Sequence, residues 1–209
     1  MYLHDAFNVS DAAEARAMLA AGRLGCLVTH GADGLFATHM PFVFDAGRQT
    51  LSGHVPRDNP HWQRAGDGQA MVIYQGLDAY ISPSWYPSKA EHGRVVPTWN
   101  YEAVHVYGRL TFHPEPEWLA SHLARLVDRF EAGREQPWAM ADAPENYLAR
   151  MMAALVGVEL SIDRIEAKRK LSQNRAEADR QGVIAGLSSS ADPADRAMAQ
   201  VMAQTGDGG

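Results

Sequence analysis

The chain has 209 residues, of which 46% are hydrophobic and 21% charged, and its formal net charge is −6. This composition is typical of a globular protein of one domain or two small ones, and the acidic balance argues against a nonspecific nucleic-acid-binding protein. No apolar run reaches membrane-spanning length, and the N-terminus lacks the basic and apolar regions of a signal peptide. The single cysteine, Cys26, cannot form an intramolecular disulfide, so we expect a cytoplasmic protein.

The first part of the chain predicts a helix followed by closely spaced strands. Ser10, with Glu14 shortly after it, is typical of a helix start and predicts a helix over residues 10–21. Asp33 and Gly34 lie between two apolar runs, which indicates a hairpin turn. A short helix is expected over residues 58–66, with Pro60 at its first position. Strands are predicted over residues 24–30, 35–44, 50–55, 69–76 and 78–82.

The second part alternates long strands with helices. Tyr101, Ala103, His105 and Tyr107 recur at every second position, which predicts a strand. Strands are expected over residues 100–113 and 155–170, and helices over 114–132, 144–155, 177–187 and, marginally, 192–204. Short hairpin connections favour antiparallel pairing, and this many strands in a small domain favour closure into a barrel. We therefore predict a mainly β protein with flanking helices (α+β), folded over residues 1–187, with a polar and partly disordered tail over 188–209.

The segment from Ile81 to Gly108 gathers two of the five tryptophans, three tyrosines and several prolines. Flat rings beside a fixed backbone and small polar groups suit a planar ligand with polar edges. The alternative is an irregular segment that packs onto its own domain or across a dimer interface. The residues alone leave both interpretations open.

Two further segments contain groups that bind anions. In SGHVPRDNPHW, residues 52–62, Arg57 precedes a helix start, and the guanidinium with the free backbone amides would suit a phosphate. The alternative is a capped short helix with Arg57 in solvent. KRKLSQNR, residues 168–175, could contact a phosphate, form ion pairs across an interface or end a strand in solvent. No histidine, cysteine or carboxylate spacing indicates a metal site, and no hydrolase, NTPase or dinucleotide-binding motif is present.

The motifs GHVPRDNPHW, AYISPSWYP, VPTWNYEAVHVYG and KLSQNR, in this order, resemble the PaiB family of FMN-binding negative transcriptional regulators. The similarity runs from Met1 to about Leu187. Val55-Pro56 departs from the Leu-Ala-like pair expected in the family, but Arg57 and Asn59 remain. The resemblance implies an antiparallel split β-barrel of the FMN-binding type, and a homodimer with flavin at the subunit interface.

The resemblance also implies which residues bind FMN. Those of the strand along the flavin ring and of the phosphate-binding turn are Thr38, His39, Ser52, Gly53, His54, Arg57 and Asn59. Those of the strand that reaches the flavin of the partner subunit are Trp99 and Asn100, and those of the C-terminal strand end are Lys170 and Gln173. No catalytic residue is assigned.

Four functions remain open at this point. The family implies a flavin-binding regulator, although the sequence shows no helix-turn-helix pattern or basic recognition helix that would contact DNA directly. An FMN-dependent oxidoreductase that uses NAD(P)H or a small organic substrate is the main alternative, because flavin transfers hydrides without a catalytic triad. A haem-binding split barrel and an empty barrel that acts as an interaction module are the other two.

Overall fold

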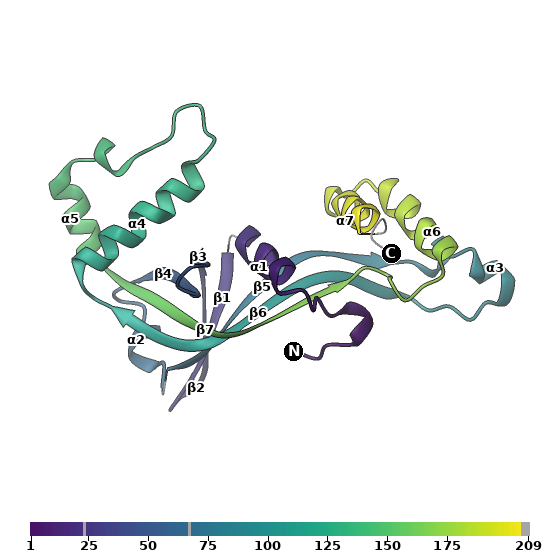
Figure 1. Ribbon diagram of the computed structural model, residues 1–209, viewed down its shortest axis with the longest axis horizontal. Helices are drawn as coiled ribbons and strands as arrows, with labels where there is room; N and C mark the ends of the chain where they lie inside the picture. Colours follow the sequence, from purple (N-terminus) through teal and green to yellow (C-terminus); the bar gives the residue numbers. More distant parts are fainter. Residues whose placement is uncertain (23, 67, 206–209) are drawn as a thin grey trace. The chain divides into compact units, whose positions relative to one another are not determined.

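The computed structural model describes residues 1–22, 24–66 and 68–205, and the chain forms two compact units (Figure 1). Unit 1 comprises Met1–Ala12, Gln75–Val104 and Glu166–Gly209, and unit 2 comprises Ala13–Tyr74 and His105–Ile165. Three long strands contribute to both units. Within the described residues, no helix combines the length and apolarity needed to cross a membrane.

Seven strands form one sheet in the order β2-β1-β5-β6-β7-β4-β3. The strands are β1 (Leu24–Gly31), β2 (Gly34–Pro41), β3 (Val43–Asp45), β4 (Thr50–Pro56), β5 (Gln69–Ile81), β6 (Thr98–His113) and β7 (Leu155–Lys170). The sheet is antiparallel, as predicted, and the predicted hairpin is present where Gly31 pairs with Gly34. Gly34 has φ +97°, a conformation that glycine adopts without strain.

The two edges of the sheet in unit 2 are joined by a single residue. Strand β2 ends at Pro41, β3 begins at Val43, and Phe42 between them is 1% exposed. The sheet must therefore curl until its outer strands meet, although among the described residues no hydrogen-bonded ladder closes it. A Cβ on Gly53 of β4 would collide with the side chain of Met40, so glycine permits this close approach. The predicted split-barrel fold is confirmed. The described part of the sheet is curled, and its two edge strands are not joined by a ladder of hydrogen bonds.

Helices flank the sheet in both units. In unit 2 these are α1 (Ala12–Ala21), α2 (His61–Arg64), α4 (Pro116–Glu131) and α5 (Glu145–Ala153), with the 3₁₀ helix η3 (Met140–Asp142). In unit 1 they are η1 (Asp5–Phe7), η2 (Pro83–Trp85), α3 (Ser88–His92), α6 (Glu177–Ser188) and α7 (Pro193–Gln204). Helix α4 packs on β4 and also on the adjacent β7, where a Cβ on Gly157 would collide with the ring of Trp118.

The core of unit 1 lies beneath the two C-terminal helices, which pack side by side (Figure 1). Its buried members come from the end of β5, from Tyr86, from the residue after β7 and from both helices: Ala79, Ile81, Tyr86, Leu171, Val183, Leu187, Met198, Ala199 and Met202. The predicted helix over 192–204 is thus present as α7. The predicted disorder of the glycine-rich end concerns residues 206–209, which lie outside the described residues.

Candidate functional site

The predicted site residues lie in both units, seven in unit 2 and four in unit 1. The side chains of each group have their own contacts. In each group the structure also adds residues that the sequence did not indicate.

In unit 2 a buried histidine connects two of the predicted residues. The Nδ1 atom of His61 lies 2.8 Å from Oγ1 of Thr38, and its Nε2 lies 2.9 Å from Oγ1 of Thr29. Asn59 accepts a hydrogen bond from the His61 amide at 2.9 Å and donates from Nδ2 to the Thr38 hydroxyl at 3.4 Å. Burial lowers the pKa of His61, so the ring is held neutral and fixes the Thr38 hydroxyl. His39, the next residue along β2, is exposed on the opposite face.

Arg57 is exposed, but its guanidinium is anchored. Its Nε donates to the carbonyl of Ala153 at 3.0 Å and its Nη2 to the carbonyl of Leu155 at 2.9 Å. The backbone of Arg57 is fixed as well, since its amide donates to the carbonyl of Ala154 at 2.8 Å. A guanidinium has five N–H donors, so the two carbonyls hold its orientation and leave donors for an anion. The phosphate interpretation thus depends on this side chain rather than on the amides at the start of α2. That helix has only four residues, and its His61 amide already donates to Asn59.

Strand alternation separates the remaining predicted residues of unit 2. Ser52 and His54 face α4, where His122 bridges them: its Nε2 lies 3.2 Å from Nδ1 of His54 and its Nδ1 lies 3.2 Å from Oγ of Ser52. Gly53 lies on the other face, against Met40. Burial is the main cause that lowers the pKa of His122 to about 3, and the charges of His54 and Arg125 add to it. The Ser52 hydroxyl and His54 ring therefore contribute to packing under α4.

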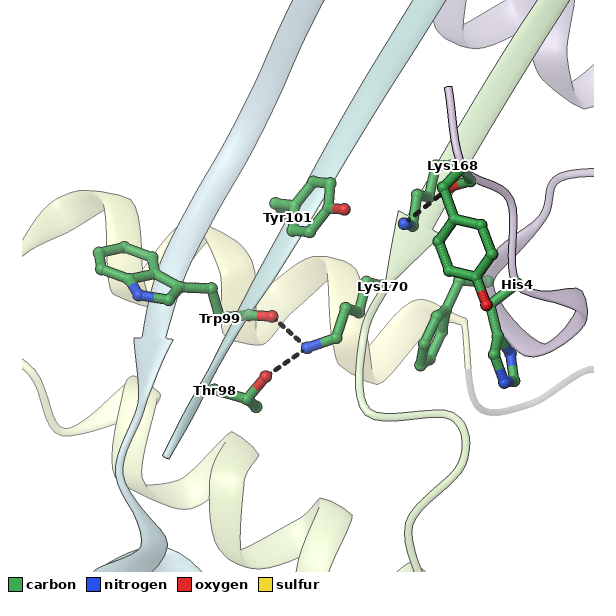
Figure 2. A pocket seen from close by; sticks show the side chains of 8 residues that line it. His4, Thr98, Trp99, Tyr101, Lys168 and Lys170 are labelled. Carbon is green, nitrogen blue, oxygen red and sulfur yellow. Dashed lines mark hydrogen bonds between the residues drawn. The ribbon is translucent and has the colours of Figure 1, made fainter. Parts of the chain in front are cut away.

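In unit 1 a pocket of about 400 Å³ contains two of the predicted residues (Figure 2). It is lined by Tyr2, His4, Phe7, Thr98, Trp99, Tyr101, Lys168 and Lys170. Figure 2 shows the Lys170 ammonium between Thr98 and Trp99, where it donates to the Thr98 hydroxyl at 2.6 Å and to the Trp99 carbonyl. The Trp99 indole is 55% exposed and contacts Tyr80 edge-on, with 5.9 Å between the ring centroids.

The other two predicted residues of unit 1 have structural contacts. Asn100 is fully buried on the opposite face of β6 from Trp99 and donates to the Ser172 hydroxyl at 3.0 Å. Gln173 closes the turn after β7, since its Oε1 accepts from the Leu171 amide at 2.6 Å. Their assignment to the flavin stays a prediction. Trp85, the other tryptophan of the aromatic segment, packs against the unit 1 core, with its ring over Gly186 of α6.

The polar groups of unit 2 by themselves suit an anion, and the pocket of unit 1 by itself suits a ligand with a flat ring. Arg57 presents an oriented guanidinium, Thr38 and Asn59 present polar groups, and the unit 1 pocket combines aromatic rings with two ammonium groups. These are the groups that a phosphate, a polar ring edge and a ring face require. Among the residues that the structure describes, no cluster of three or more His, Cys, Asp or Glu side chains is placed to hold a metal ion.

Sequence reasoning missed His61, Tyr2 and Phe7, and it considered Lys168 only as part of the basic segment 168–175. His61 lies within the helix-start motif SGHVPRDNPHW. Its position between Thr29 and Thr38 depends on the pairing of β1 and β2, which the motif does not show. The N-terminal residues reach the pocket through contacts with β7 that are distant in sequence, such as Lys168 Nζ to the Tyr2 carbonyl at 3.2 Å. No local pattern predicts such a contact.

Residues 1–164 match the protein family described as "Putative FMN-binding domain". Protease synthase and sporulation protein PAI 2 of Bacillus subtilis is 33% identical over 205 residues, which cover 97% of this chain and 96% of the relative. The family prediction is therefore tested over almost the whole length of both proteins.

Solved structures show the same fold. The conserved hypothetical protein Rv2991 of Mycobacterium tuberculosis matches with a TM-score of 0.60 at 17% identity, over 85% of this chain and 95% of that one. The flavocytochrome Anf3 of Azotobacter vinelandii matches with a TM-score of 0.59 at 17% identity, over 83% of this chain and 74% of that one. Family match and fold agree, and the chain belongs to the PaiB family of split-barrel, FMN-binding-domain proteins.

Proposed function

We propose that the protein binds FMN as a homodimer and that Arg57 holds the flavin phosphate. The observation that carries this proposal is the anchored guanidinium of Arg57, which keeps donors exposed although its Nε and Nη2 are bonded to backbone carbonyls. A phosphate dianion is a strong acceptor for the N–H donors of a guanidinium. Membership of the FMN-binding-domain family supports this choice of ligand.

The proposal assigns the other residues by their chemistry. Thr38 and Asn59, positioned by His61, offer hydrogen bonds to the polar edge or the ribityl chain of the flavin. Trp99, with its exposed indole, and Lys170 contact the ring from the partner subunit. Bound FMN would supply hydride and electron transfer, while these side chains bind and orient it.

The role that we propose for the bound flavin is regulatory. The Bacillus subtilis relative is named for protease synthesis and sporulation, which are regulated processes. The net charge of −6 favours action through a partner protein or the redox state of the flavin over direct binding to DNA. An FMN-dependent oxidoreductase is the second candidate, because the pocket of about 400 Å³ offers room for a second ligand. Anaerobic titration with NADPH separates the two: rapid bleaching of the flavin would favour the enzyme.

The phosphate assignment is tested by comparing FMN with riboflavin, which lacks the phosphate. We expect Arg57→Ala to weaken FMN binding by about 1–3 kcal/mol, the range for hydrogen bonds to a charged group. Riboflavin affinity should stay unchanged, because no phosphate contact is lost. Quenching of flavin fluorescence during titration measures both affinities.

Arg64→Ala is the matched control for this experiment. Arg64 is a half-exposed arginine of unit 2 that lies 3.8 Å from Asp33, so its removal changes the net charge equally. A thermal melt of each variant shows whether loss of the bonds to Ala153 and Leu155 has disturbed the fold. Equal losses for FMN and riboflavin, or an Arg64→Ala effect as large as that of Arg57→Ala, would refute the assignment.

A further inference from the structure

Two lysines of unit 1 lie in the pocket without a carboxylate partner. Lys168 and Lys170, two of the three lysines in the chain, follow one another at i and i+2 on β7 and therefore lie on one face. Lys168 is only 7% exposed. The polar contacts of the two ammonium groups are neutral oxygens: the Tyr2 carbonyl, the Thr98 hydroxyl and the Trp99 carbonyl.

The acidic side chains on the unit 1 parts of β6 and β7 are engaged elsewhere. Glu102 on β6 binds Arg169 at 2.7 Å, and Glu166 on β7 contacts the amino group of Met1. Within the described part of the chain, neither Lys168 nor Lys170 forms an ion pair. Arg175 adds a third positive charge: with burial as the main cause, the charges of Lys168 and Arg175 lower the pKa of Lys170. A buried charge is costly unless it is paired, so the pocket has an unmet requirement for an anion.

The walls of the pocket are aromatic. The Lys168 ammonium lies 5.6 Å from the ring centroid of Tyr2 and 5.3 Å from that of Tyr101, and the Lys170 ammonium lies 5.8 Å from that of Phe7. Cation–π contacts partly stabilise the ammonium groups but do not neutralise them. Rings that line a pocket of about 400 Å³ favour a ligand with a flat ring that stacks against them.

We propose that this pocket binds a planar aromatic anion, whose negative group contacts Lys170 and Lys168 and whose ring packs against Tyr2, Phe7 and Tyr101. The proposal shares Lys170 and Trp99 with the proposed flavin site, and in this respect rests on the proposed function. The planar anion has two sources: the ring of a flavin from the partner subunit, which becomes anionic when the flavin is reduced, or a free aromatic carboxylate that acts as a second ligand.

Chemical labelling of lysines tests the proposal in the unmodified protein. Reductive methylation with formaldehyde and a borane, followed by peptide mass spectrometry, reports separate rates for Lys89, Lys168 and Lys170. The probe is benzoate, which is planar and anionic. At a benzoate concentration about ten times its dissociation constant, the labelling rate of Lys170 should fall roughly tenfold. Lys89 is exposed and binds Ser84 outside the pocket, so its rate should not change.

Two comparison compounds separate charge from shape. Benzamide has the ring without the charge, and cyclohexanecarboxylate has the charge without the flat ring, so both should protect Lys170 much less than benzoate. Protection of Lys89 to the same extent as Lys170, equal protection by benzamide, or unchanged labelling of Lys170 at saturating benzoate would overturn the proposal.

Repeating the labelling with FMN-saturated protein identifies the source of the anion. If FMN itself protects Lys170 and benzoate adds nothing, the pocket receives the flavin. If benzoate still protects Lys170 in the FMN complex, the pocket binds a separate ligand; both results support an anion site. Protein that shows no spectral change with FMN yet retains benzoate protection would refute the proposed function and leave the pocket assignment intact.

Discussion

At the residue scale, His122 of α4 connects the helix to the sheet through titratable groups. Its ring lies between the Ser52 hydroxyl and His54, each at 3.2 Å, and the ring of Trp118 stacks on it with centroids 5.3 Å apart. Each neutral imidazole has one donor and one acceptor, so the Ser52, His122 and His54 groups form a single chain of hydrogen bonds. A second proton on both rings would leave two N–H groups facing each other across the His54–His122 contact.

The surroundings of this pair contain further charged groups. Glu159 of β7 pairs with Ser52 in the strand register and its Oε2 is buried, while Arg48 lies 3.8 Å from that oxygen. On α4, the charge of Arg125 acts on His122. Burial is the first cause that lowers the pKa of both histidines, and the nearby arginine adds to it for His122. The neutral form is thus the one compatible with the packed helix.

The lowered pKa of His122 predicts a loss of stability in acid. In the unfolded chain this histidine binds a proton near its ordinary pKa of 6.5, whereas in the folded protein it does so only near 3. Between these values the unfolded state holds more protons, so the free energy of unfolding decreases as the pH falls. We expect His122→Gln to make this slope shallower by up to about 1.4 kcal/mol per pH unit. Urea unfolding at several pH values between 6.5 and 4 measures the slope of unfolding free energy against pH for both proteins.

His30→Gln provides the control for this measurement. His30 is exposed at the end of β1, so the same substitution should leave the slope of unfolding free energy against pH close to that of the natural protein. A His122→Gln slope indistinguishable from that of His30→Gln would show that His122 does not couple helix packing to pH.

At the element scale, most helices and strands could be predicted, and the differences have physical reasons. Alternation defines β6 and helical spacing defines α4, because these patterns reflect the burial of one face. Strand β5 was predicted as two strands, over residues 69–76 and 78–82. In the structure it continues from Gln69 to Ile81 because Gly76 lies directly against Glu102 on β6, where a Cβ would be 2.9 Å from that of Glu102. Contact with a neighbouring strand is not visible in a local pattern.

The candidate site residues stay a prediction from the family resemblance. In the structure Arg57, Thr38, Asn59 and Lys170 have polar groups with defined hydrogen bonds. Asn100 was predicted together with Trp99, and the structure places the two on opposite faces of β6, as adjacent residues of a strand are, so that one is buried and the other exposed. Tyr2 and Phe7 were missed because their place in the pocket depends on the pairing of the N-terminal segment with β7, where Asn8 bridges Lys168.

Helix α7 illustrates how tertiary contacts stabilise an element of weak local preference. Asp192 caps its start by accepting a hydrogen bond from the Ala194 amide at 2.8 Å. Met198, Ala199 and Met202 recur at i, i+1 and i+4 and are buried against the core of unit 1. Methionine and alanine give a weak periodic signal, so the sequence did not reveal that this segment completes a core.

The burial of α7 predicts a large effect for a core substitution. Met198 is 0% exposed, and Met198→Ala should lower the free energy of unfolding by about 2–5 kcal/mol, because it removes apolar contacts and leaves a cavity. Gln200→Ala, two residues along the same helix and exposed, should change it by less than about 0.5 kcal/mol. Urea unfolding followed by circular dichroism compares them, and similar small effects for both would mean that α7 is dispensable for the stability of unit 1.

At the scale of the whole molecule, the proposed flavin site depends on two subunits. Arg57 and Lys170 are assigned to the same flavin, but the resemblance to the family places the second residue on the partner subunit. In a symmetric dimer this arrangement produces two equivalent sites, each with Arg57 from one subunit and Lys170 from the other. A site built from a single chain would contain both residues of that chain. The two arrangements differ in how defects in separate subunits combine.

A heterodimer of two variants distinguishes these arrangements. Arg57→Ala and Lys170→Gln chains are co-expressed with different C-terminal tags, and the mixed dimer is purified through both tags. C-terminal tags are chosen because N-terminal residues line the pocket. If the site is shared between subunits, one site has both defects and the other has neither, so the heterodimer should bind about one FMN per dimer with the affinity of the natural protein. Each homodimer of a single variant should bind FMN weakly at both sites. A heterodimer that binds FMN as weakly as the variant homodimers would place each flavin on a single chain. Light scattering of the purified samples verifies that they are dimers.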